Sequence, residues 1–245
     1  MSDQPEITVH VLPPSHPCAT VRAALEHKGL TYDWVEMDMT GHNEGMEKIY
    51  GEGQKTVPGA VIDGEAVHGS VAILRRLEEL QAPPPLYPET NGDSVREAEE
   101  WGAGGLQDLG RRLPWGALHF RPEAFGILGG AGLLDPAGTD YAIRFIRAGW
   151  KYHGISAVQL ASDLAGLPEK LAHIDSLVSD GVLGGEEPNA ADLQIGATIR
   201  VLQSVGDLGP LLEGTAAAGI SERFFRQRDS KIPAGAFPAG WVPSA

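Results

Sequence analysis

The sequence predicts a mixed α/β domain followed by an all-α domain. Alternating apolar patterns typical of strands occur only in the first part of the chain, and the remainder shows helical spacing alone. A proline-rich segment, residues 83–88, separates the two parts and cannot continue a helix. We therefore expect an α/β domain over residues 1–81, a linker over 82–92, and a helical domain with an irregular tail over 93–245.

The composition excludes several classes of function. The net charge is −14, so nucleic acids and anionic membranes are not expected as main partners. The chain begins with no basic or apolar leader, and no stretch approaches the ~20 apolar residues of a spanning helix. We expect a cytoplasmic protein. The single cysteine, Cys18, and eight scattered histidines predict no disulfide within the chain and no metal site.

The first half of the α/β domain reads as two strand–helix units. Ile7, Val9 and Val11 alternate with Thr8, His10 and Leu12, which predicts a strand. A helix can begin at Pro17, because proline is tolerated in a first turn, and end at Gly29. A second alternating strand follows at 32–37, and a helical turn is expected around 44–50.

The second half reads as a hairpin and a helix. Asp63-Gly64 between the apolar runs 57–62 and 65–67 is a strong hairpin signal, because both turn positions need positive φ. Ser70 is predicted to cap a helix that ends near residue 81. The expected order is β-α-β-α-β-β-α, with a parallel first pair and an antiparallel edge.

The remainder of the chain shows helical stripes at 95–113, 140–153, 169–178 and 192–205. Asn189 and Asp192 have the spacing of an N-cap and its reciprocal acid, and we expect them to serve folding. The Gly-rich segment 120–137 is predicted to be a flexible flap. In the tail, Phe237 and Trp241 are expected to pin an irregular segment across the body of the protein, near the site.

Four motifs in order resemble the glutathione transferase family over nearly the whole chain. They are Ser15-His16-Pro17-Cys18 at the first strand–helix junction, Val57-Pro58 before the third strand, His68-Gly69-Ser70 at the third helix, and Asn189-Ala190-Ala191-Asp192 in the helical domain. The resemblance implies a thioredoxin-like N-terminal domain, an all-α C-terminal domain and a homodimer.

The resemblance also implies a thiol-binding site at Val57, Pro58, His68, Gly69 and Ser70. In this family the backbone of the residue before a cis-proline pairs with the bound tripeptide as an extra strand would. Ser70 would offer its hydroxyl and free amides to the γ-glutamyl carboxylate. His68 stands where Glu or Gln is usual, so the co-substrate is glutathione or a related low-molecular-weight thiol.

Two residues compete for the chemistry. Ser15 holds the first motif position, where the hydroxyl of serine-type transferases donates a hydrogen bond to the sulfur. Cys18 lies inside the helix, and if it is reactive the chemistry becomes thiol–disulfide reduction, including deglutathionylation. His16 is expected to be a solvated loop residue. A third possibility is a non-catalytic member that binds ligands or partners.

The activity implied is conjugation or transfer of the thiol to a small apolar electrophile, a detoxification chemistry. The family places the electrophile between the two domains. Trp101 and Trp115 are the candidates for its pocket, with core packing as the alternative role.

Overall fold

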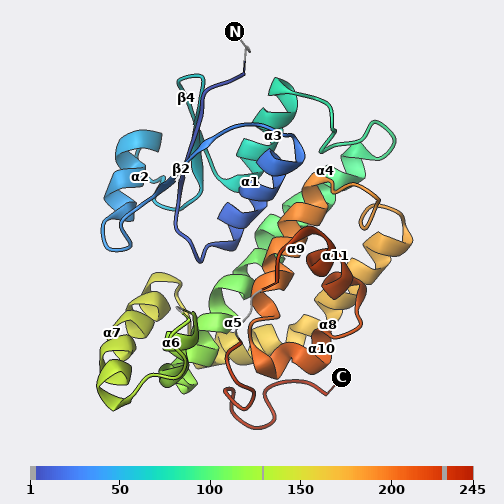
Figure 1. The fold of residues 1–245 in the computed structure, drawn as a ribbon. Helices are drawn as coiled ribbons and strands as arrows, with labels where there is room; N and C mark the ends of the chain where they lie inside the picture. Colours follow the sequence, from blue (N-terminus) through green and yellow to red (C-terminus); the bar gives the residue numbers. More distant parts are fainter. Residues whose placement is uncertain (1–3, 129, 228–230, 245) are drawn as a thin grey trace.

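The computed structural model describes residues 4–128, 130–227 and 231–244. Figure 1 shows a sheet with its helices at one end of the molecule and a helical domain packed beneath it. Among the described residues, no helix is long and apolar enough to cross a membrane, and no group of side chains could hold a metal ion.

The N-terminal domain has the β-α-β-α-β-β-α order that the sequence predicts. Its elements are β1 (Ile7–Val11), α1 (His16–His27), β2 (Asp33–Glu36), α2 (His42–Tyr50), β3 (Gly59–Ile62), β4 (Glu65–His68) and α3 (Ser70–Leu80). The sheet order is β2-β1-β3-β4; β1 pairs parallel with β2 and antiparallel with β3, and β3 pairs antiparallel with β4. This is a thioredoxin-like fold.

The predicted turns of this domain are confirmed. Asp63 and Gly64 join β3 to β4 with φ of 49° and 84°, as the hairpin signal requires. Gly29, with φ of 64°, directly follows Lys28, the C-cap residue of α1. The Val57–Pro58 peptide bond is cis, as the resemblance implies. A second cis bond, Pro83–Pro84, was not predicted.

The C-terminal domain is all-helical. Its elements are α4 (Gly92–Trp101), a π-helical segment (Gly102–Leu106), α5 (Gln107–Phe120), α6 (Phe125–Leu128), α7 (Pro136–Tyr152), α8 (Ala157–Ser179), α9 (Ala190–Leu202), α10 (Gly209–Leu212) and α11 (Ala216–Phe224). The single helix expected over 95–113 is therefore part of three consecutive segments. The sequence analysis missed α11, although Thr215 caps it by accepting a hydrogen bond from the Ala218 amide.

Helix α9 is a buried helix that contacts both domains. All of its residues except Arg200 are buried. It packs against α1 of the N-terminal domain as well as α4, α5 and α11. The Thr20 hydroxyl of α1 donates to the Leu193 carbonyl across this contact, at 3.3 Å. The two domains therefore share one buried interface, and α1 and α3 lie on the side of the sheet that faces it (Figure 1).

The C-terminal tail lies at the far end of the helical domain. Phe237 and Trp241 both contact Phe120 at the end of α5, with ring centroids 6.4 and 5.8 Å apart. The two aromatic residues pin the tail, as predicted, but at a position remote from the sheet, so the expectation that the tail lies near the site is wrong (Figure 1).

Candidate functional site

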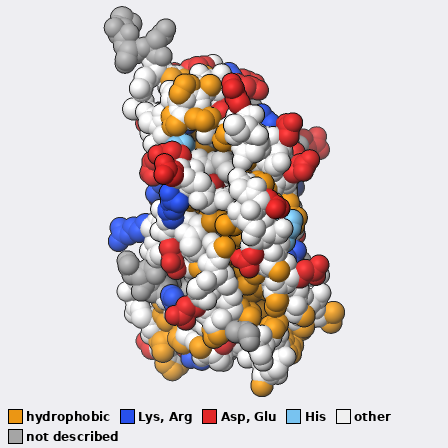
Figure 2. Space-filling model, turned by 90° about the vertical axis from the view of Figure 1, so that its right-hand side faces the viewer, with side chains coloured by type: hydrophobic (Ala, Val, Ile, Leu, Met, Phe, Trp, Pro, Cys, Tyr) orange, Lys and Arg blue, Asp and Glu red, His pale blue; other side chains and the backbone are white. Residues whose placement is uncertain are grey.

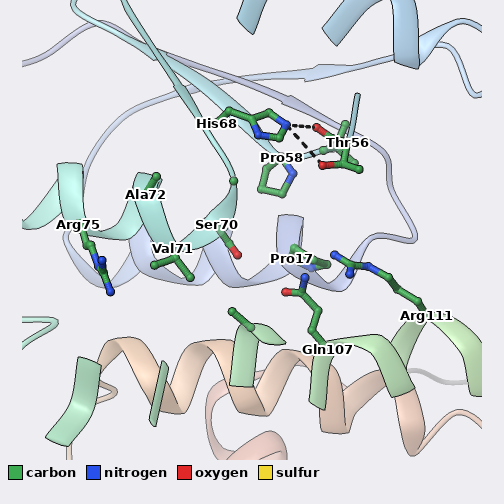
Figure 3. Close-up of a pocket in the computed structure, with 13 residues that line it drawn as sticks. Pro17, Thr56, Pro58, His68, Ser70, Val71, Ala72, Arg75, Gln107 and Arg111 are labelled. Carbon is green, nitrogen blue, oxygen red and sulfur yellow. Dashed lines mark hydrogen bonds between the residues drawn. The ribbon is translucent and has the colours of Figure 1, made fainter. Parts of the chain in front are cut away.

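A cleft of about 440 Å³ lies where the sheet domain meets α5 and the π-helical segment. It is lined by Pro17, Thr56, Val57, Pro58, His68, Gly69, Ser70, Val71, Ala72, Arg75, Ala103, Gln107 and Arg111 (Figure 3). All five residues predicted to bind the thiol lie in this lining. The cleft therefore brings together the proline loop, the start of α3 and one face of the helical domain.

The first turn of α3 opens into the cleft without a cap. Gly69 precedes the helix with φ of 90° and ψ of 145°, and no side chain caps the helix. Within the described part of the chain, no hydrogen-bond acceptor pairs with the amides of Ser70, Val71 and Ala72. Free amides and the positive end of the helix dipole together favour an anionic ligand group.

The Ser70 hydroxyl is held by a polar chain that crosses between the domains. It donates to Oε1 of Gln194 at 2.9 Å, and Nε2 of Gln194 donates to Oε1 of Gln107 at 2.6 Å. Ser70 is thus the first helical residue, and the expectation that it caps the helix is wrong. The sequence analysis missed both glutamines; a polar side chain on the otherwise apolar helix α9 was the available signal.

The loop before β3 presents an unpaired stretch of backbone. The Pro58 carbonyl accepts the Gly69 amide at 3.0 Å, which ties the loop to the start of α3. Among the residues described, neither the amide nor the carbonyl of Val57 has a hydrogen-bond partner. The backbone of Val57 is therefore available to pair with an extended ligand.

His68 is fixed in one orientation by the same loop. Its Nε2 lies 2.7 Å from the Thr56 carbonyl and 3.4 Å from the Thr56 hydroxyl (Figure 3). Because a carbonyl only accepts, Nε2 carries a proton, and Nδ1 would be an acceptor in the neutral form of the ring. Tyr50 packs against the other side of His68, with ring centroids 5.8 Å apart. A neutral imidazole can accept from a ligand amine but supplies no negative charge.

Two arginines stand at opposite ends of the cleft. Nη2 of Arg75 lies 2.7 Å from Oε1 of Glu100 and 3.7 Å from Oε2 of Glu99. Glu99 is fully buried, and burial raises its pKa to about 7 although the Tyr87 hydroxyl donates to it at 2.9 Å. Arg111 pairs with Asp108 at 3.1 Å. None of the cleft's lining residues is acidic.

The comparisons with known proteins agree with this geometry. Residues 9–85 match the family model described as glutathione S-transferase, N-terminal domain. The match covers the sheet domain and stops short of the helical domain, so these residues are similar to that N-terminal domain. No curated protein matches the chain.

Solved structures similar to the whole chain share the fold at low sequence identity. The β-etherase LigF from Sphingobium sp. strain SYK-6 has a TM-score of 0.63 and 20% identity, covering 89% of this chain and 93% of its own. A glutathione-bound maleylacetoacetate isomerase from Anaeromyxobacter dehalogenans 2CP-1 has a TM-score of 0.53 and 21% identity, and the match covers 90% of each chain. FzlA from C. crescentus has a TM-score of 0.54 and 19% identity, and the match covers 98% of this chain and 96% of FzlA. The chain therefore has a glutathione-transferase fold.

At the first strand–helix junction of this glutathione-transferase fold, Ser15 caps α1. Its Oγ accepts a hydrogen bond from the Cys18 amide at 3.4 Å, and the same side chain also hydrogen-bonds the Cys18 thiol. The Ser15 hydroxyl would have to turn away from that thiol to donate to a ligand. Pro17 lines the cleft, whereas Ser15 is not among the lining residues. His16 is buried, contrary to expectation, and its ring lies against Gly110 of α5.

Cys18 is placed unfavourably for thiol chemistry. Its side chain is 2% exposed, and burial raises its pKa to about 11. The thiol therefore stays protonated near neutral pH and is out of reach of a disulfide in solution. This geometry is that of a buried apolar residue.

Trp101 and Trp115 do not line the cleft. Trp101 packs edge-on against His173 of α8, with centroids 4.5 Å apart. Trp115 lies over Gly149 of α7, where an added Cβ would come within 2.9 Å of its ring. The described residues of the Gly-rich segment 120–137 are also absent from the lining, and Gly129 lies outside the described residues.

The helical side of the cleft is instead built from one row of α5 and the π-helical segment. Ala103, Gln107 and Arg111 follow one another at intervals of four residues, which places them on a single helix face. π-Helical turns frequently occur at functional sites. The wall opposite the thiol-binding loop is therefore polar and cationic, where the sequence predicted aromatic side chains.

Proposed function

We propose that this protein binds glutathione or a related low-molecular-weight thiol in the cleft and transfers it to a small electrophile. The observation that carries the proposal is the juxtaposition of unpaired backbone groups at Val57 with uncapped amides at the start of α3. A tripeptide thiol needs both features, an extended backbone to pair with and a pocket for its γ-glutamyl carboxylate. The similar isomerase with bound glutathione supports the same choice of ligand.

The ligand would lie across the cleft in a defined direction. Its cysteinyl backbone would pair with Val57 as an added strand. Its γ-glutamyl carboxylate would accept from the amides of Ser70 and Val71 and from the Ser70 hydroxyl, which would then turn from Gln194 to the ligand. His68 would accept from the γ-glutamyl amine through Nδ1.

The chemistry assigned to the site is activation of the sulfur. Ser15 would donate its hydroxyl proton in a hydrogen bond to the thiolate, beside the first turn of α1. The thiol proton leaves to water, the sulfur lone pair forms a C–S bond, and the electrophile's leaving group or π-electron pair takes up the displaced charge. Holding both reactants together in one cleft would supply much of the rate enhancement.

We also propose that two chains pair as a homodimer and that residues 1–81 and 93–245 are the two domains.

The first test is calorimetry with glutathione on the wild type and on Ser70→Ala. We expect micromolar to millimolar binding that the substitution weakens at least ~10-fold, about 1.4 kcal/mol. Gln194→Leu is the matched control, because it removes the interdomain hydrogen bond and keeps the hydroxyl. Equal losses in both variants would assign the effect to domain packing. No binding of glutathione by the wild type would rule out glutathione as the ligand, and the same titration with other bacterial low-molecular-weight thiols would then decide between a different thiol and a non-catalytic protein.

Two rival functions make different predictions in the same system. A Cys18-dependent reductase requires a reactive thiol, which the burial of Cys18 disfavours, and it would lose activity in Cys18→Ala. Glutathione transfer should be unaffected by that substitution. A non-catalytic member would bind glutathione but turn over none of a panel of electrophiles.

A further inference from the structure

The lining of the cleft has the opposite charge to the chain. The sequence carries 33 acidic and 19 basic residues, yet the cleft contains two arginines and no carboxylate. Figure 2 shows acidic side chains scattered along the whole of one face of the molecule. A cleft lined by charge of one sign focuses the field of those charges and raises the local concentration of oppositely charged ligands.

The two arginines differ in how many carboxylates contact each guanidinium. Nη2 of Arg75 faces two carboxylates, those of Glu99 and Glu100. Arg111 has one carboxylate partner, Asp108, and Asp108 also accepts from Arg112 at 3.0 Å. A guanidinium has five N–H donors, so Arg111 keeps donors for a ligand.

Arg111 also lies at the end of the cleft where the sulfur should be. Figure 3 shows its side chain extending toward Pro17 in the first turn of α1, whereas Ser70 and Arg75 lie toward the other end. The γ-glutamyl carboxylate is assigned to the Ser70 end. The group that meets Arg111 would then be either the glycyl carboxylate of the thiol or a group of the molecule that reacts with the sulfur. The matched conjugates below separate the two, because both carry the glycyl carboxylate.

We propose that the electrophile carries a carboxylate or another oxyanion, and that Arg111 binds this group. The inference rests on the proposed function for the thiol and replaces the apolar electrophile that the sequence predicts. The planar fork of a guanidinium matches a carboxylate in a bidentate pair, which would orient the electrophile as well as hold it. Gln107, one turn earlier on the same face of α5, offers a further polar contact.

A matched pair of product analogues tests this assignment. S-(2-carboxyethyl)glutathione and S-propylglutathione differ only by a carboxylate in place of a methyl group. By calorimetry at low salt, we expect the wild type to bind the carboxyethyl conjugate at least ~10-fold more tightly. Arg111→Gln should abolish the preference and leave the affinity for the propyl conjugate within about two-fold.

Arg144→Gln is the control for a general charge effect. Arg144 is an exposed cation on α7 that does not line the cleft, so its loss should leave the preference intact. Equal affinity of the wild type for the two conjugates would overturn the proposal. A preference that survives in Arg111→Gln would also overturn it.

Succinate, used alone, separates this proposal from the proposed thiol. If the wild type binds neither conjugate but binds succinate, and Arg111→Gln weakens that binding, the thiol assignment is wrong and the anion site stands. If the wild type binds neither the conjugates nor succinate, both proposals are overturned.

Discussion

Helices α9 and α3 begin in opposite ways. At the start of α9, the Asn189 side chain accepts from the Asp192 amide at 3.0 Å, and the Asp192 carboxylate accepts from the amides of Asn189 and Gly184 at 3.1 and 2.8 Å. At the start of α3, Gly69 offers no side chain, and the first amides open into the cleft. A helix start with its donors satisfied stabilises the fold, whereas one with free donors can bind a ligand.

The closed start of α9 also supports the open start of α3. Gln194 lies two residues after Asp192 on the buried helix, and it joins the Ser70 hydroxyl to Gln107. A shift of α9 would therefore move the acceptor that holds Ser70 in place. The comparison predicts that substitutions at α9 act first on stability and those at α3 first on binding.

The largest effect is expected at the start of α9. Asp192→Ala removes the acceptor of the buried Asn189 amide, which costs about 1–3 kcal/mol when left unsatisfied, and of the more exposed Gly184 amide, which costs less. We expect the free energy of unfolding to fall by about 3–4 kcal/mol, measured by urea denaturation followed by circular dichroism. Asn189→Ala should cost less, about 1–2 kcal/mol. A loss below about 1 kcal/mol in Asp192→Ala would show that water takes over the hydrogen bonds that the Asp192 carboxylate accepts.

The second prediction concerns the buried carboxylate of Glu99, a residue of α4 that contacts Arg75 of α3. Because the pKa of Glu99 is raised to about 7 from its ordinary 4.5, the folded protein binds this proton more tightly than the unfolded chain. Its contribution to stability is complete below about pH 4.5 and falls by about 3 kcal/mol as the pH rises past 7. Glu99→Gln should remove this part of the pH dependence.

Urea unfolding at about pH 5 and pH 8 measures the effect. Glu100→Gln is the control, since Glu100 pairs with the same arginine from an exposed position. Glu100→Gln should keep the slope that Glu99→Gln loses. If Glu99→Gln retains the full slope, the carboxylate is ionised throughout, and its contact with Arg75 is stronger than its burial.

The sequence predicted features that depend on residues close together along the chain. The hairpin at Asp63-Gly64 and the capping box at Asn189–Asp192 follow from short sequence spacings, and both are confirmed. The conformation of Ser70 could not be predicted in this way. Its hydroxyl is directed by Gln194, 124 residues further along the chain, and no local pattern encodes that contact.

The polar wall of the cleft was missed for a related reason. Gln107 and Arg111 follow a π-helical segment, Gly102–Leu106. One extra residue in a helical turn rotates the following face by about 100°. A periodicity based on 3.6 residues per turn therefore cannot tell which side of α5 meets the cleft. Trp101 and Trp115 were expected there because of the family resemblance, and both pack elsewhere.

The third prediction concerns Gly69, which allows α3 to begin without a cap. An added Cβ would meet no atom within 4 Å, so the cost of Gly69→Ala is conformational and comes from φ of 90°. We expect about 2 kcal/mol of destabilisation in urea unfolding and weaker glutathione binding. Gly219→Ala in α11 is the matched control: it also meets no atom and has ordinary φ, so it should stabilise by about 0.5–1 kcal/mol. Gly69→Ala with unchanged stability would show that the loop relaxes.

The smallest effect on stability is expected at Ser15, and it separates capping from chemistry. Ser15→Ala removes both the cap of α1 and the hydroxyl and should cost about 1 kcal/mol in urea unfolding. Ser15→Asn keeps a capping oxygen and should retain stability. If the hydroxyl donates to the thiolate, both variants raise the pKa of bound glutathione, followed by thiolate absorbance against pH, to the same extent. If the pKa of bound glutathione in Ser15→Asn is unchanged from that in the wild type, Ser15 is a cap alone, and α1 then resembles the start of α9 rather than that of α3.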